Sequence, residues 1–155
     1  MTIIELRSGN KLAVSVEPVT DEDFKKLTVK RYFFNWKKLK GQPLLFKLVH
    51  PVSGDILGLM HLLDFPQEDR IEVKLLAVSV ENKGVGKHFD RIAGNLIAFT
   101  CRLAIAKYGY KACISLIPKT ELKPHYIRAY GMMDAGLQVY LDGRPLFNLL
   151  KKYIQ

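Results

Sequence analysis

Residues 75–109 read LLAVSVENKGVGKHFDRIAGNLIAFTCRLAIAKYG and place a strand pattern, a glycine turn and a helix pattern in direct succession. The apolar run at 75–80 predicts a buried strand, and apolar residues spaced three and four apart across 88–109 predict a long helix. Gly84 and Gly86, in the turn between them, allow the backbone to approach a ligand closely. A turn that opens a helix presents unpaired N–H groups and the positive end of the helix dipole. The stretch therefore predicts a phosphate site.

Two common nucleotide-binding loops do not match this turn. A dinucleotide fingerprint needs a third glycine three residues after Gly86, and Phe89 stands there. A triphosphate loop needs Ser or Thr after the Gly-Lys pair and a glycine five residues before it, but His88 and Glu81 occupy those positions. We therefore expect a phosphate-bearing ligand of another kind.

Alternating and apolar runs elsewhere predict a sheet built mainly of antiparallel strands. The strand after the long helix is expected to run parallel to the strand at 71–80, because a helix crossover separates them. The segment 146–154 is apolar and of undefined type. Strands are expected at 3–7, 11–16 (ending before Pro18, which lacks an N–H), 43–50, 56–63, 71–80, 111–117 and 137–141. Helices are expected at 20–27, 29–41, 88–109 and 120–130.

Length and composition fit one folded domain that spans residues 1–155, with 48% hydrophobic residues and a net charge of +9. The charge favours anionic partners, namely a phosphorylated cofactor, an acidic substrate or RNA. No apolar run reaches the roughly 18 residues of a membrane helix, and the start MTIIELRSGN lacks a signal-peptide pattern, so a cytoplasmic location is expected. Cys101 and Cys113 are expected as free thiols, and no metal site is expected.

The segment 29–41, VKRYFFNWKKLKG, combines aromatic and basic residues. One interpretation is a surface that binds RNA or an acidic substrate. The other is an amphipathic helix that packs Phe33, Trp36 and Leu39 inward and leaves its lysines in solvent.

Three segments resemble the GNAT superfamily of N-acetyltransferases. IEVKLLAVSVENKGVGKHFDRIA at 71–93 is similar to the acetyl-CoA-binding core of that family. VEPVTDEDFKKL at 16–27 resembles its first strand and helix, and TELKPHYIRAYGM at 120–132 resembles its later helix, which carries a tyrosine before a glycine. With the strands between them, the resemblance covers nearly the whole chain. It implies an α/β (α+β) fold in which a mixed, mostly antiparallel central sheet is flanked by helices.

The resemblance implies acetyl-CoA as the acyl donor. Thr120 stands near the position where the family often has an asparagine, and the resemblance implies that Thr120 also binds the cofactor. The family loop reads Gln/Arg-x-x-Gly-x-Gly/Ala, but Glu81 holds the basic or amide position here, and Lys83 and Lys87 are expected to supply the positive charge. The strand edge expected to pair with the pantetheine arm is Ala77, Val78, Ser79 and Val80, and the residues expected at the pyrophosphate are Lys83, Gly84, Val85, Gly86 and Lys87.

The same resemblance suggests the catalytic groups. Glu72, on the core strand, is the candidate base that accepts the amine proton through water. The alternative for Glu72 is a surface ion pair with Lys74, and Asp64 and Asp69 are further candidates for the base.

Tyr126, with Tyr130 second, is the candidate acid for the leaving thiolate. The two tyrosines share a helix face because they are four residues apart, and a packed aromatic pair is the alternative.

The predicted function is transfer of an acetyl group to an amine by direct attack on the thioester. Acceptors consistent with this expectation are a small-molecule amine, a peptide or an aminoacyl-tRNA, and a homodimer is left open. The competing hypotheses are a GNAT-fold module that binds CoA without transfer and an RNA-binding protein that uses the segment 29–41.

Overall fold

The computed structural model describes residues 1–154 and contains two compact units. The first unit combines Met1–His61 with Leu75–Leu96, and the second combines Leu62–Lys74 with the chain from Ile97 onward. Strands β5 (Ile56–Phe65) and β6 (Arg70–Val78) and helix α2 (Ile92–Tyr108) each have residues in both units. Each unit is described by itself below.

The first unit contains a small antiparallel sheet of strands β2 (Lys11–Ala13), β1 (Thr2–Glu5) and β7 (Phe89–Asp90), in that order. β1 and β2 confirm the expected first hairpin, with Ile3 opposite Leu12. The expected strand 11–16 is divided, however, because a separate strand begins at Ser15 and pairs in another sheet.

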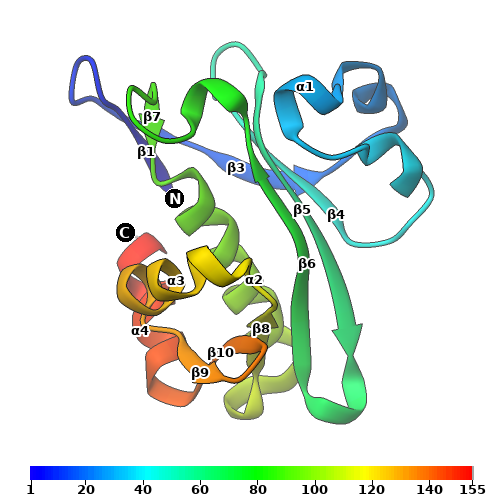
Figure 1. Ribbon diagram of the computed structural model, residues 1–155, viewed down its shortest axis with the longest axis vertical. Helices are drawn as coiled ribbons and strands as arrows, with labels where there is room; N and C mark the ends of the chain where they lie inside the picture. Colours follow the sequence, from blue (N-terminus) through cyan, green and yellow to red (C-terminus); the bar gives the residue numbers. More distant parts are fainter. Residues whose placement is uncertain (155) are drawn as a thin grey trace. The chain divides into compact units, whose positions relative to one another are not determined.

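The other strands of the first unit follow one another as an antiparallel series (Figure 1). They are β3 (Ser15–Pro18), β4 (Leu45–Val49) and the first part of β5, with Val16 opposite Leu48 and Phe46 opposite Met60. The expectation that Pro18 lies outside the strand is wrong. β3 is the edge strand of its sheet, where a residue without an N–H costs no ladder bond.

Short helical turns replace the helix expected at 29–41. α1 (Val29–Tyr32) ends at Phe33, whose φ of 68° is left-handed, and η2 (Trp36–Leu39) follows as a separate turn. Tyr32 and Trp36 are buried in the core cluster of this unit and Leu39 packs against it, which favours the packing interpretation. The expected inward packing of Phe33 is wrong, because Phe33 is 47% exposed. The expected helix at 20–27 is the 3₁₀ turn η1 (Asp21–Lys26), and the Asp23 carboxylate accepts a hydrogen bond from the Thr20 N–H at 2.7 Å.

The second unit holds the remaining strands, β8 (Cys113–Leu116), β10 (Gln138–Asp142) and β9 (Met133–Ala135). β8 pairs in parallel with β6, Ile71 opposite Ile114, which confirms the expected crossover. β10 is antiparallel to both β8 and β9. The full strand order β3-β4-β5-β6-β8-β10-β9 is the mixed, mostly antiparallel sheet that the sequence predicts.

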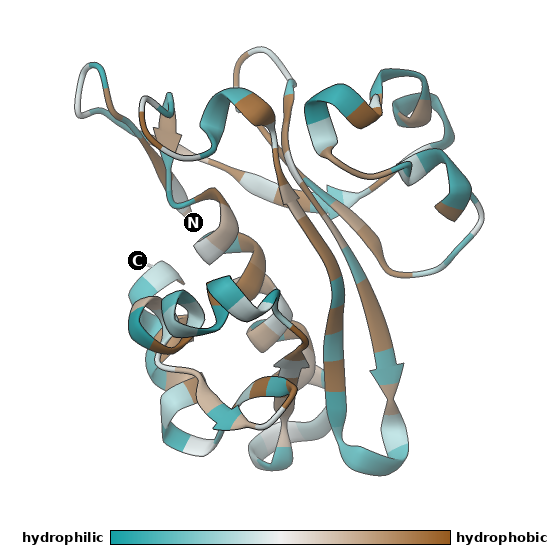
Figure 2. Cartoon of the chain, in the orientation of Figure 1, coloured by the Kyte–Doolittle hydropathy of each residue, from teal (hydrophilic) through white to brown (hydrophobic). Residues whose placement is uncertain are grey.

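Helices flank this sheet. The second unit contains η3 (Pro66–Glu68), most of α2, η5 (Gly109–Lys111), η6 (Thr120–Leu122), α3 (Lys123–Tyr130) and α4 (Gly143–Ile154). α4 resolves the undefined segment 146–154 as a helix, which buries Leu146, Leu149, Leu150 and Tyr153. Figure 2 shows that apolar residues are frequent along β5 and β6. No helix within residues 1–154 is long and apolar enough to cross a membrane.

Both cysteines are free thiols, and burial raises the pKa of Cys101 to about 12. Within residues 1–154, no group of three or more His, Cys, Asp or Glu side chains could hold a metal ion.

Candidate functional site

The long helix begins later than the sequence predicts, and this changes the geometry of the expected phosphate site. α2 starts at Ile92, not at His88. The backbone between the glycine turn (residues 81–87) and the helix pairs instead with the N-terminal strand, Phe89 opposite Glu5. The His88 carbonyl also accepts a hydrogen bond from the Leu6 N–H at 2.9 Å. These sheet bonds compete with helix formation over 88–90.

Asn82 holds the glycine turn at both ends. It lies in the 3₁₀ turn η4 (Val80–Asn82), is 4% exposed, and donates a hydrogen bond from Nδ2 to the Ser79 hydroxyl at 2.9 Å. Its Oδ1 accepts the Phe89 N–H at 2.9 Å. The Ser79 N–H in turn donates to the Leu57 carbonyl on β5 at 2.9 Å. Sequence reasoning missed Asn82, although an asparagine in a turn is a known signal for such backbone bonds.

The glycine turn itself extends into solvent. Gly84 and Gly86 have φ angles of 74° and 80°, and a Cβ on either would meet nothing within 4 Å. Val85 between them is fully exposed. The two expected phosphate lysines have other partners: Lys87 Nζ lies 2.7 Å from Asp90 Oδ1, and Lys83 Nζ lies 4.3 Å from the centre of the Phe33 ring. Backbone conformation therefore explains these glycines without a ligand.

The start of α2 (residues 91–95) has the features of an anion site. Arg91 is left-handed at φ 77°, its N–H donates to Asp90 Oδ1 at 2.9 Å, and its carbonyl accepts the Asn95 N–H at 3.0 Å. Ile92, Ala93 and Gly94 form the first turn, where N–H groups have no preceding helical carbonyl. The sequence signal was present, because Arg91-Ile92-Ala93-Gly94 satisfies the Gln/Arg-x-x-Gly part of the family loop.

Asn95 reinforces this helix start. Its side chain is fully buried, and Nδ2 donates to the carbonyls of Thr2 at 2.8 Å and Arg91 at 2.7 Å. These two donations fix the amide orientation, and its Oδ1 has no hydrogen-bond partner among residues 1–154. Asn95 thus ties α2 to the N-terminal strand.

The core strand has a free edge beside this helix start. β6 pairs with β8 only as far as Val73, opposite Leu116, so no strand within residues 1–154 continues that pairing over Lys74–Val78. The surroundings of Gly58 on β5 show that β6 and the start of α2 both pack closely against this position. A Cβ built on Gly58 would lie 2.8 Å from Ile92 Cγ2 and 3.4 Å from the Ala77 carbonyl oxygen. The candidate strand edge and the helix start therefore belong to one packed region.

Glu81, which departs from the family loop, is held by Arg31. The Arg31 guanidinium donates to both oxygens of Asp55, at 2.9 and 2.7 Å, and from Nε to Glu81 at 3.1 Å, with a further Nη2 contact to Glu81. The Arg31 hydrogen bonds lower the pKa of Asp55. Burial acts to raise the pKa of Glu81, but hydrogen bonds, chiefly from Arg31, outweigh it and bring the pKa below its ordinary value. Glu81 therefore links η4 to α1.

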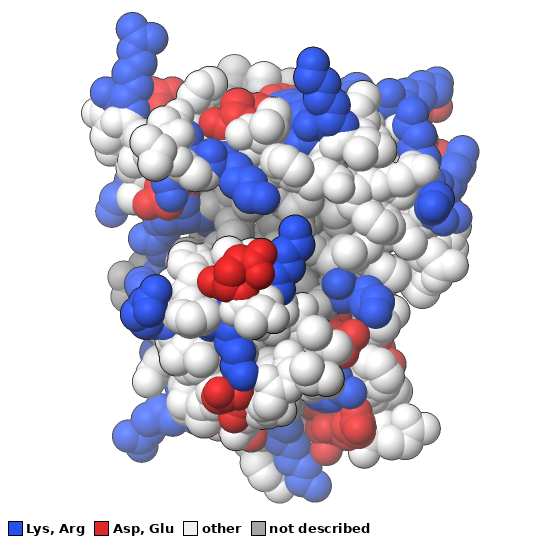
Figure 3. Space-filling view, viewed as in Figure 1, with Lys and Arg blue, Asp and Glu red and all other residues white. Residues whose placement is uncertain are grey.

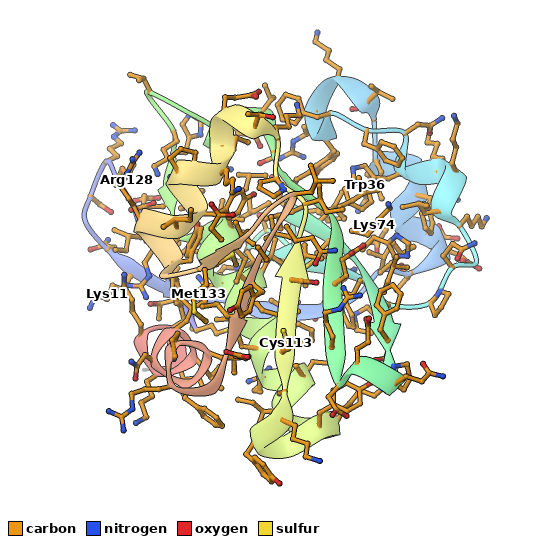
Figure 4. All side chains as sticks on the ribbon, turned by 60° about the horizontal axis from the view of Figure 1, so that its bottom comes forward. Lys11, Trp36, Lys74, Cys113, Arg128 and Met133 are labelled. Atoms are coloured by element: carbon orange, nitrogen blue, oxygen red, sulfur yellow. The ribbon has the colours of Figure 1, made fainter. Side chains whose placement is uncertain are left out.

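Glu72 lies in the second unit and is only 8% exposed. Its Oε1 is 3.5 Å from Arg70 Nη1, which also donates to the Ser115 hydroxyl at 2.7 Å. Within residues 1–154 it forms no ion pair with Lys74, an exposed residue labelled in Figure 4, so the alternative of a surface pair with Lys74 does not hold and Arg70 is the partner instead.

The further candidate bases are placed as follows. Asp64 pairs with Lys107 and accepts the Tyr108 hydroxyl, which raises the pKa of Tyr108 to about 12. Asp69 is left-handed at φ 51°, and its carbonyl accepts the Cys113 N–H. Both residues are thus accounted for by local structure.

Tyr126 and Tyr130 lie together on α3, the helix that also carries Arg128 (Figure 4). Their ring centres are 5.9 Å apart, and His125 contacts both rings edge-on at 5.8 and 5.7 Å. Burial raises the pKa of Tyr126. The packed aromatic pair is confirmed.

Thr120 is exposed and begins η6, so α3 starts at Lys123 and not at Thr120.

The sheet order, the free edge of β6 and the helix that follows define the GNAT fold, as comparison with solved structures shows. Ard1 from Thermoplasma volcanium matches with a TM-score of 0.62 at 10% identity, over 85% of this chain and 99% of that one. N-acetylglutamate synthase from Neisseria gonorrhoeae, complexed with coenzyme A and L-arginine, matches with 0.61 at 13% identity, over 84% of this chain and 33% of that one.

A mutant AtaT toxin, bound to the C-terminus of the antitoxin AtaR and acetyl-CoA, matches with 0.58 at 11% identity, over 90% of this chain and 99% of that one. No protein-family model matches the sequence, and no curated protein matches it at significance. At these identities the likeness is one of fold.

Proposed function

We propose that this protein is an acyl-CoA-dependent N-acyltransferase that uses acetyl-CoA. The observation that carries the proposal is the free edge of β6 at Lys74–Val78 beside the first turn of α2. An extended pantetheine arm carries amide groups that can pair with a strand edge, and a pyrophosphate suits helix N–H groups. Solved structures of the same fold hold coenzyme A or acetyl-CoA, which supports the choice of donor.

The proposal moves the pyrophosphate from the glycine turn to the helix start. The N–H groups of Ile92, Ala93 and Gly94 would contact the phosphates, with the dipole of the 17-residue helix α2 behind them. Ala77 and Val78 would pair with the pantetheine amides. Ser79 and Val80 would instead shape the bend after the strand, since the Ser79 N–H already donates to Leu57.

In the proposed reaction an amine nitrogen attacks the thioester carbonyl carbon. The new C–N bond forms as the C–S bond breaks, the amine loses one proton, and the CoA thiolate takes one. Glu72 is proposed to accept the amine proton through water, and Tyr126, with Tyr130 as second candidate, to supply the proton to sulfur. The small exposed area of Glu72 and its contact with Arg70 hold the carboxylate in one place, which supports this role.

An affinity measurement can separate the two candidate phosphate sites. Ala93→Glu places a carboxylate in the first turn of α2. The helix dipole stabilises this negative charge, but the charge repels a pyrophosphate. Acetyl-CoA affinity, measured by calorimetry, should fall about tenfold or more, while the melting temperature stays level or rises. Val85→Glu in the exposed glycine turn is the matched control, because it adds the same charge, and it should change affinity little. A larger loss with Val85→Glu would return the phosphate to the glycine turn, and no acetyl-CoA binding by the wild type would refute the proposal.

Thiol release in the presence of acetyl-CoA then tests transfer. The acceptor panel should contain small amines, peptides and aminoacyl-tRNA, the last because the fold is shared with AtaT complexed with acetyl-methionyl-tRNAfMet. Glu72→Gln should lower turnover by roughly 10²–10⁴-fold with acetyl-CoA affinity unchanged. Tyr126→Phe should lower turnover in the same way if that hydroxyl is the acid.

A CoA-binding module without transfer is the second candidate function. It is favoured by the packing of Tyr126 against Tyr130 and by the contact of Glu72 with Arg70, which give both candidate catalytic groups a structural role. Such a module would bind acetyl-CoA and release no thiol with any acceptor.

We further propose a single domain over residues 1–155, a cytoplasmic location and a homodimer. Size-exclusion chromatography with light scattering tests the last of these.

A further inference from the structure

The second unit contains a groove, and none of its lining residues belongs to the proposed acyltransferase site. It has a volume of about 570 Å³ and is lined by Tyr110, Gly143, Arg144, Phe147, Asn148 and Lys151. A volume of this size falls in the range of about 300–1,000 Å³ that is typical of ligand sites. The groove uses one turn, η5, and one helix, α4.

One face of α4 forms most of the groove. Its four longer lining residues, Arg144, Phe147, Asn148 and Lys151, have the spacing of positions i, i+3, i+4 and i+7, so they share a single stripe of the helix. The opposite stripe is buried in the core of the unit. Packing of the buried stripe therefore orients the other stripe, with its two cations, phenylalanine and asparagine, toward solvent.

The groove also exposes aromatic rings. Tyr110 is 81% exposed and Phe147 is 36% exposed, which is unusual for side chains that gain free energy from burial. The Phe147 ring has no polar group that would account for its exposure. Two accessible π-faces thus border one groove.

No anionic partner for the cations of the groove is found among residues 1–154. Within the described part of the chain, neither Arg144 nor Lys151 forms an ion pair, and no carboxylate lines the groove. The neighbouring acid Asp142 ends β10 and is not among the lining residues. Exposed Lys111 adds a further positive charge in η5. Figure 3 shows that lysine and arginine side chains outnumber acidic ones on the viewed face, consistent with the net charge of +9.

We propose that this groove binds a single-stranded nucleic acid. Arg144 and Lys151 would contact backbone phosphates, Tyr110 and Phe147 would stack on bases, and the Asn148 amide would hydrogen-bond to a base edge. Cations interleaved with exposed aromatic rings are the features that such ligands require. An acidic polypeptide would use the cations and would leave both rings without a partner. The inference does not depend on the acyltransferase proposal, because none of its residues belongs to that site.

Fluorescence anisotropy of a labelled oligonucleotide of about 12 nucleotides, as RNA and as DNA, tests the proposal on the full chain. Arg144→Ala with Lys151→Ala should weaken binding and reduce the slope of log K against log salt by about 1.4, as two phosphate contacts require. The matched control is Lys37→Ala with Lys38→Ala, which removes two exposed charges from η2 and should have the smaller effect.

The aromatic contribution has its own pair of variants. Tyr110→Ala should weaken binding about fivefold or more through lost stacking, and Tyr110→Phe should keep most of the affinity. All substituted side chains are exposed, so circular dichroism should show unchanged folding.

Three results would overturn the proposal. One is that the wild type does not bind nucleic acid. Another is equal loss in the α4 and η2 double variants, which would leave only general basic charge. The third is binding of polyglutamate as tight as that of RNA with no effect of Tyr110→Ala, which would assign the groove to an acidic polypeptide.

Discussion

Gly58→Ala should destabilise the protein through a steric clash at the start of α2. Gly58 is buried on β5, and an added Cβ would lie 2.8 Å from Ile92 Cγ2 and 3.0 Å from Leu96 Cδ1. Ordinary contacts begin near 3.4 Å, so one side must move by several tenths of an ångström. Overpacking of this kind costs about 1–3 kcal/mol, and the stiffer unfolded chain returns roughly 0.4–1 kcal/mol.

The expected net loss is about 1–2 kcal/mol, equivalent to a fall in melting temperature of roughly 2–8 °C for a chain of this size. Urea unfolding followed by circular dichroism measures the loss. If the first turn of α2 binds acetyl-CoA as we propose, displacement of that turn should lower acetyl-CoA affinity as well. The loss of acetyl-CoA affinity distinguishes Gly58 from core positions far from the start of α2, where a substitution should lower stability alone.

A double-mutant cycle with Ile92→Ala identifies the clashing atom. Ile92→Ala alone removes Cγ2 and should cost about 2–5 kcal/mol, because the side chain is buried. In the double variant the new methyl group occupies part of the space that Ile92 leaves, so the combined cost should be smaller than the sum by about 0.5–3 kcal/mol. Strictly additive costs, or an unchanged stability for Gly58→Ala, would refute the steric reasoning.

Two further predictions concern the turn that precedes the helix. Arg31→Ala should lower the unfolding free energy at neutral pH by about 1–2 kcal/mol, since Asp55 and Glu81 lose a partly exposed partner. Both carboxyl groups have pKa values below their ordinary 3.8 and 4.5, so this stability is present above those values and disappears as pH falls through the lowered pKa. Urea unfolding at several pH values should show wild type and variant converging below about pH 4. Asn82→Ala should cost about 1–3 kcal/mol by leaving the Phe89 N–H without its acceptor, as measured by urea unfolding.

Each of these two predictions has a result that contradicts it. A constant difference between wild type and Arg31→Ala from pH 7 to pH 3 would show that Asp55 and Glu81 do not titrate with that arginine. For Asn82, the control is Ser79→Ala, which removes the acceptor of the Asn82 Nδ2 hydrogen bond and keeps the bond to Phe89. A loss for Ser79→Ala as large as that for Asn82→Ala would remove the Phe89 hydrogen bond as the main cause.

The sequence predicts the outline of the candidate site. The strand that begins near Ile71, the long helix and the parallel strand after it follow from the sequence, and their order indicates the fold class. The sequence predicts the phosphate at Gly84 and Gly86, whereas the site that we propose is the first turn of α2, which begins at Ile92. The glycines had a local explanation, a turn with positive φ, that a sequence pattern cannot distinguish from a ligand site.

Sequence alone determined the main strands and most of the long helix, because local apolar spacing records which face of each segment is buried. The strand at 71–80, the stripe along the long helix and the parallel strand after it all follow from that spacing. Tertiary structure decided what depends on residues far apart in the chain. β1 captures Phe89–Asp90 and delays the helix, Arg31 pairs with Glu81 across 50 positions, and α4 turns a basic, aromatic stripe toward solvent. These pairings are set by three-dimensional proximity, which no local period in the sequence encodes.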